Sequence, residues 1–407
     1  MTNITDLAID GTYAGITRTG KKEFNITGVQ GFNTLARVSQ TDSLEGYTFR
    51  ISARDTFELK IASTGNTEED LANSFYGIGT EDIPFKGKIL MTNVTGSTYL
   101  KMTGWKVLFN NLSNEGAVTT DAANINLRAH IDGPFSLCEK LTITDSGTAL
   151  DISGFRFAAR NQGTDGSVRG VVQTDKAAGL VAAQVTGSGA CTVDVSACFE
   201  TGSQYALEST AGTVGGLFGS IDQGAAVSVT TGDMDLLVST AAGGNAGLLA
   251  GENNGILTVS SDSTYTGSVT AAGSYAAGLV GVNGEKGRVN FAENITVSGL
   301  TASGAYAGGA AGRSEGVLAV AAGKSCTVSG STFTSTEATP ALGGAVGQAT
   351  AAPAGNFVLE NNRCAKSGNV GGFIGSFTAK EAASFTDVTV TGATFNGTGA
   401  AGHSVGG

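Results

Sequence analysis

The chain has 407 residues and a net charge of −11, with 14% charged residues, 41% hydrophobic residues and 62 glycines. A chain of this length can bury a continuous core. Its acidic balance and its scattered Lys and Arg residues argue against a nucleic-acid partner, because nucleic-acid binding requires neutralisation of phosphates. No apolar run reaches the ~18 residues of a membrane-spanning helix, so no membrane insertion is predicted.

Residues 1–165 are predicted to form an irregular N-terminal capping and entry region. Strand-like segments occur at 47–51, 88–91, 125–127 and 140–143. Two segments, 33–40 and 67–75, have a helical pattern, and Thr67 is a candidate N-cap because three acidic residues follow it. A solenoid has an open apolar end that must be covered, so we expect one of these helices to lie over it.

Residues 166–407 carry a glycine-anchored segment that returns at an almost constant interval. The segments are A-G-L-V-A at 178–182, G-G-L-F-G at 215–219, A-G-L-L-A-G at 246–251, A-G-L-V-G at 277–281, G-G-A-A-G at 308–312, G-G-A-V-G at 343–347, G-G-F-I-G at 371–375 and A-G-H-S-V-G at 401–406. The anchors Gly179, Gly216, Gly247, Gly278, Gly309, Gly344, Gly372 and Gly402 are 37, 31, 31, 31, 35, 28 and 30 residues apart. Such a period is typical of a solenoid, in which each unit buries its apolar face against its neighbours.

Apolar residues alternate within each period, which indicates strands and excludes helical repeats. About 31 residues suit one turn of a parallel β-helix with three short strands. An offset of 31 aligns Ile295 with Cys326, Val297 with Val328 and Tyr275 with Tyr306. The predicted fold is therefore all-β, a parallel β-helix of about 31-residue rungs, with Ile295 and Val297 pointing inward. Glycine at each anchor is expected to leave room for the adjacent rung.

The N-terminal region adds a resemblance to a known family. The segments that carry it are G-F-N-T-L-A-R-V-S-Q at 31–40, L-E-G-Y-T-F-R-I at 44–51, Y-G-I-G at 76–79 with I-P-F-K-G-K-I at 83–89, and V-L-F-N-N-L-S-N-E-G-A-V at 107–118. Together with the glycine-anchored rungs, they resemble bacterial surface proteins with GLUG-type repeats. The pattern is broken where 310–311, 345–346 and 403–404 replace the large apolar pair. The resemblance implies an extracellular, right-handed β-helix with an adhesive or scaffolding role, and it supplies no catalytic residues.

The cysteines and the chain ends suggest a compartment. The cysteines, Cys138, Cys191, Cys198, Cys326 and Cys364, form no C-x-x-C motif and are interpreted as buried thiols. The first residues do not form a signal peptide, and the chain stops inside what would be the next rung. We therefore expect a C-terminally truncated fragment of an extracellular or cell-surface protein.

Asp233 and Asp235 form the best candidate catalytic pair, because alternation places them on one face of a strand. Parallel β-helices can cleave polysaccharides when two or three carboxylates converge, or when calcium-binding carboxylates meet a basic residue. No further carboxylate or cation is in register with this pair, so we interpret the two residues as solvated and predict no catalytic residues.

Four acidic residues, Asp222, Glu252, Glu285 and Glu315, follow the anchors at offsets of 6, 5, 7 and 6 residues. Stacked in one column they would repel one another unless screened or bridged. They are candidate ligands for a line of divalent cations, with calcium as the cofactor, or else a solvated turn.

The expected function is that of a non-catalytic extracellular adhesin or structural rod, which binds a host or microbial surface glycan or protein through a lateral face. One alternative is a polysaccharide lyase or hydrolase with a β-helix fold. Another is a phage tail-spike or fibre segment, although the sequence shows no coiled-coil heptads.

Overall fold

The computed structural model describes residues 136–395 with gaps at 158, 163–165, 167, 242, 366–367 and 379–383. Outside this range it describes residues 9–12, 15–18, 23–29, 31–35, 43–53, 57–60, 81–92, 100–103, 107–120, 130–131 and 405–406. All regular secondary structure in these residues is β-strand. No helix that could cross a bilayer occurs in this part of the chain.

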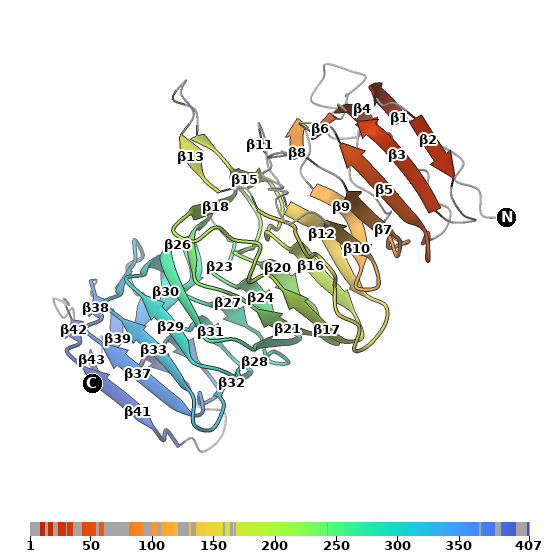
Figure 1. Ribbon diagram of the computed structural model, residues 1–407. Helices are drawn as coiled ribbons and strands as arrows, with labels where there is room; N and C mark the ends of the chain where they lie inside the picture. The colour runs from red at the N-terminus through yellow and green to blue at the C-terminus, as the bar shows by residue number, and fades with distance from the viewer. Residues whose placement is uncertain are drawn as a thin grey trace.

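The repeats form a parallel β-solenoid in which successive turns lie side by side (Figure 1). Each regular turn adds a strand to a nine-stranded sheet, then to a five-stranded sheet, then to a 17-stranded sheet. The nine-stranded sheet holds β9 (Val107–Ser113), β12 (Ser136–Ile143), β16 (Ala182–Gly187), β20 (Phe218–Ile221), β24 (Ala250–Asn253), β27 (Val280–Asn283), β31 (Ala311–Ser314), β36 (Val346–Ala349) and β40 (Ile374–Phe377). The five-stranded sheet holds β17 (Gly189–Asp194), β21 (Ala225–Thr230), β25 (Ile256–Val259), β28 (Arg288–Phe291) and β32 (Val317–Val320).

The 17-stranded sheet receives one or more segments from each turn. Its strands are β15 (Val171–Thr174), β18 (Gln204–Ser209), β19 (Val214–Gly215), β22 (Met234–Thr240), β23 (Ala246–Gly247), β26 (Ser263–Ala277), β29 (Ile295–Ser298), β30 (Thr301–Gly308), β33 (Ser325–Ser329), β34 (Thr332–Thr334), β35 (Ala341–Gly343), β37 (Asn356–Glu360), β38 (Arg363–Cys364), β39 (Asn369–Gly371), β41 (Val388–Thr391), β42 (Thr394–Phe395) and β43 (Val405–Gly406). A short antiparallel pair, β13 (Asn161–Gln162) and β14 (Val168–Arg169), stands apart from these sheets.

The 31-residue register is confirmed. Ile295 pairs with Cys326, and Val297 pairs with Val328 one turn later. All four side chains are fully buried. Thr296 lies between the two buried residues and is partly exposed, as strand alternation requires.

The N-terminal strands already stack in parallel before the glycine motif begins. One sheet runs through β3 (Glu23–Val29), β5 (Thr48–Ala53), β7 (Lys88–Thr92) and β10 (Ala117–Thr120), and another through β4 (Gly31–Leu35), β6 (Phe57–Lys60), β8 (Leu100–Thr103) and β11 (His130–Ile131). At the outer end, β1 (Ile9–Thr12) and β2 (Gly15–Arg18) pair antiparallel with β4 and β3. Register partners such as Thr48 and Lys88 are unevenly spaced along the chain, so the region is irregular, as expected.

The helix predicted at 33–40 is wrong where it is described, because residues 33–35 belong to strand β4. Their backbone pairs with β1, and the sheet pairing overrides the weak local helical pattern. The rest of that segment, the helix predicted at 67–75 and the strand predicted at 125–127 lie outside the described residues.

The glycine anchors require a correction, because the eight glycines do not form one column. Gly215 pairs with Gly247, Ala277 with Gly308, and Gly343 with Gly371. Gly216, Gly278, Gly309, Gly344 and Gly372 therefore lie one position further along the turn. Gly402 lies outside the described residues, and the partner of Gly371 is Gly406.

The need for a small residue at this bend is confirmed by close backbone contacts. A Cβ on Gly308 would lie 2.4 Å from the carbonyl oxygen of Ala311, and one on Gly216 would lie 2.0 Å from that of Leu248. The last glycine of each motif has a second role. A Cβ on Gly347 would lie 2.7 Å from the backbone nitrogen of Ala307, so glycine lets the two strands that flank the bend approach closely.

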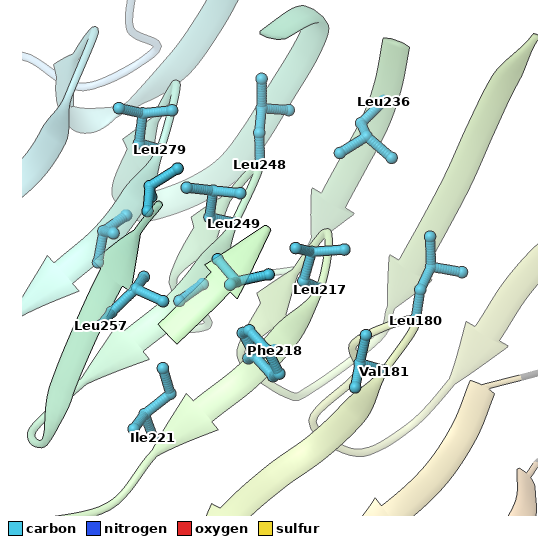
Figure 2. Close-up of a cluster of buried hydrophobic side chains, with 14 of the residues drawn as sticks. Leu180, Val181, Leu217, Phe218, Ile221, Leu236, Leu248, Leu249, Leu257 and Leu279 are labelled. Atoms are coloured by element: carbon cyan, nitrogen blue, oxygen red, sulfur yellow. The ribbon is translucent and has the colours of Figure 1, made fainter. Parts of the chain in front are cut away.

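A continuous hydrophobic core runs through the turns (Figure 2). Leu217 and Phe218 from one turn, Leu248 and Leu249 from the next, and Leu279 from the third are completely buried. The five cysteines are also buried and unpaired, which confirms their interpretation as small core residues.

Candidate functional site

The four acidic residues do not stack in one column. Glu252 is in register with Val282, and Val282 with Arg313. Asp222 follows Ile221, the register partner of Asn253, and therefore lies two positions beyond the column of Glu252. Glu315 likewise lies two positions beyond Arg313.

Three of these carboxylates have partners within the protein. Asp222 accepts a hydrogen bond from Gln184 (2.8 Å), and Glu252 accepts one from Asn254 (2.8 Å). Burial raises the pKa of Asp222. Glu315 forms an ion pair with Arg313. Among the described residues, no group of three or more His, Cys, Asp and Glu side chains could hold a metal ion.

Asp233 and Asp235 serve neighbouring turns rather than each other. Asp233 accepts a hydrogen bond from the backbone N–H of Thr264 (2.8 Å), which ties two turns together. Asp235 accepts a longer bond from the Gln204 amide (3.3 Å), and Gln204 in turn accepts one from Arg160 (3.1 Å). The structure therefore gives Asp233 a backbone-binding role and Asp235 a place in a polar chain on the surface.

A tyrosine–arginine cluster on the outside of the rod joins residues that the sequence left separate. The rings of Tyr275 and Tyr306, in register one turn apart, stack with centroids 4.8 Å apart and planes at 21°. Arg313 donates a hydrogen bond to the Tyr275 hydroxyl (3.1 Å), with its guanidinium carbon 5.5 Å from the ring centroid. Glu315 pairs with the same guanidinium. All four side chains are partly exposed, so this tyrosine–arginine cluster is accessible from outside.

The alignment of Tyr275 with Tyr306 was visible in the sequence, but Arg313 was not a candidate. Arg313 belongs to strand β31 of the nine-stranded sheet, whereas the tyrosines belong to β26 and β30 of the 17-stranded sheet. Only the bend at 308–310 brings the two sheets together here. Comparison with protein-family models, with curated proteins and with solved structures found no match to this chain.

Proposed function

We propose that this chain is a non-catalytic structural or adhesive segment of a bacterial surface protein, which binds a surface glycan or protein through a lateral face. The observation that supports this best is the extent of the register-stacked solenoid, whose sheets offer a long surface. The bacterial and extracellular assignment rests on the resemblance of the entry segments and rungs to GLUG-type proteins. Repeat solenoids commonly use such extended surfaces for binding.

The distribution of carboxylates favours binding over catalysis. Asp233 binds the backbone of the next turn, and Asp222, Glu252 and Glu315 each have a partner within the protein. Hydrolysis or elimination of a glycan needs an acid and a base that converge on one bond. Within the described residues, these candidates do not converge in that way.

The test of the proposed function is binding of the fluorescently labelled chain to bacterial and epithelial cells. We expect saturable binding that is lost when the cells are treated with periodate, if the ligand is a glycan, or with protease, if it is a protein. No saturable binding to any of these surfaces would contradict the proposal.

A parallel assay addresses the enzymatic alternative. The chain is incubated with a panel of plant, bacterial and animal polysaccharides, with and without calcium, and new reducing ends and unsaturated products are measured. We expect neither product. Turnover that disappears in Asp233→Asn would favour the polysaccharide-cleaving alternative.

A further inference from the structure

We propose that the tyrosine–arginine cluster of Tyr275, Tyr306, Arg313 and Glu315 is a binding site for a neutral saccharide. This inference rests on the proposed function, because it names the ligand class and the place on the lateral face. It starts from departures from the regular repeat that meet at one place on the rod.

The aromatic stack is the first departure. The register partner of Tyr306 in the following turn is Ala341, and that of Ala341 is Asn369. The solenoid therefore continues without an aromatic side chain in this column. The tyrosines occupy an outward, partly exposed position in two successive turns, so the core does not require them.

Arg313 is the second departure. Its register neighbours are Val282 and Gln348, so a cation in this column is not a requirement of the fold either. The Nε atom of Arg313 is buried and has no hydrogen-bond partner. A buried donor without an acceptor costs about 1–3 kcal/mol, so this arrangement is not the one that best stabilises the rod. A ligand hydroxyl that turns the side chain slightly would supply an acceptor.

The length of one turn is the third departure. Gly308 and Gly343 are register partners 35 residues apart, whereas Ala277 and Gly308 are 31 apart. The longer turn contains an exposed loop at 336–339. A carboxylate oxygen of Glu337 in this loop lies 3.6 Å from the position a Cβ on Gly273 would occupy, so the loop reaches back to the turn that carries Tyr275. Insertions in repeat proteins often mark the binding face.

The chemistry of the tyrosine–arginine cluster favours a neutral sugar. Partly exposed tyrosine rings offer apolar carbon for the C–H groups of a pyranose, and their hydroxyls remain polar. The planar groups of Arg313 and Glu315 can bond to neighbouring sugar hydroxyls. Because Glu315 already compensates the charge of Arg313, the pair offers no net positive charge to a sulfated or carboxylated polymer.

The test is native affinity electrophoresis of the full chain in gels that contain dextran, mannan, xylan or laminarin, with heparin as the anionic comparison. We expect at least one neutral polymer to retard the protein. Tyr306→Ala and Arg313→Gln should each weaken this retardation at least about tenfold, the size of a hot-spot truncation. Tyr306→Phe, which keeps the ring, should weaken it by about threefold or less, the loss of one hydrogen bond.

Asn290→Ala is the matched control, because Asn290 lies on β28 in the five-stranded sheet and is partly exposed. It should retain full binding. Circular dichroism checks folding of each variant, and protection of Tyr275 and Tyr306 from nitration by the polymer gives a readout on the unmodified sequence.

Three results would overturn the inference: equal retardation of Tyr306→Ala and the parent chain, retardation by heparin alone, or no retardation by any neutral polymer. Cell binding that survives both Tyr306→Ala and Arg313→Gln would overturn it while the proposed function stands. Cell binding that is sensitive to protease and insensitive to periodate would assign the surface to a protein partner instead.

Discussion

Ile295 lies directly beside Cys326 of the next turn, 31 residues later, and both side chains are completely buried. The pair shows how the core is built, because one inward column accepts a large branched residue in one turn and a thiol in the next. Phe357 continues the same column and is also fully buried. Total volume and polarity, rather than identity, are what each inward position constrains.

The inward and outward faces of strand β29 predict opposite responses to the same substitution. Val297→Asp places an unpaired carboxylate in the core and should lower the free energy of unfolding by several kcal/mol. Thr296→Asp, on the partly exposed face, should change it by about 0.5 kcal/mol or less. Denaturant titration of both variants measures the difference, and equal effects would show that the register is wrong.

The buried thiols predict a loss of stability at alkaline pH. Burial raises the pKa of Cys326 from 9.0 to about 12 and that of Cys191 to about 11. Because the folded pKa values are raised, their contribution is complete below pH 9.0 and is lost as the pH rises toward the folded values. Within this window each thiol should lower the free energy of unfolding by about 1.4 kcal/mol per pH unit.

Denaturant midpoints measured from neutral pH upward should therefore fall, and Cys326→Val should make the fall less steep. Val suits this column, which already holds Ile295 and Phe357. An unchanged slope in Cys326→Val, or rapid labelling of Cys326 by a thiol reagent in the folded protein, would contradict its place in the core.

The bend at Gly308 predicts intolerance of even one methyl group. Gly308→Ala would place a Cβ 2.4 Å from one carbonyl oxygen and 2.7 Å from another, and we expect a cost of about 1–3 kcal/mol. Gly232→Ala is the control, because its nearest contact is at 3.4 Å, and it should change stability by about 0.5 kcal/mol or less. Thermal melts of both variants compare them directly.

Calcium is expected to leave stability unchanged, because the four acidic residues occupy different columns and three of them have protein partners. A ligand that binds only the folded state raises the melting temperature. A rise on addition of calcium that is absent in Glu252→Gln would restore the cation line as a site.

The repeat and its strand register could be predicted from the sequence, because a period of two within a period of about 31 residues has one economical solution. The choice between adjacent glycines could not. In the pair Gly215 and Gly216, both positions lie too close to neighbouring backbone for a Cβ, so the pattern does not show which one pairs with Gly247.

The error in the anchors explains the failure of the acidic column, because offsets counted from two different columns gave Glu252 and Glu315 the same apparent position. The tyrosine–arginine cluster was missed for another reason. Tyr306 and Arg313 belong to different sheets, and their approach depends on the bend at 308–310, whose geometry no periodicity reveals.

Two matched deletions test the central claim, that the chain is a modular rod with its binding site on particular turns. Removing Gly216–Gly247 joins register partners and preserves the tyrosine–arginine cluster, whereas removing Gly278–Gly308 joins register partners and removes Tyr306. Each variant should remain folded and become shorter by about 4.8 Å, one strand spacing. Only the second should lose binding to the neutral polysaccharide. Collapse of either variant, or equal binding by both, would contradict the account.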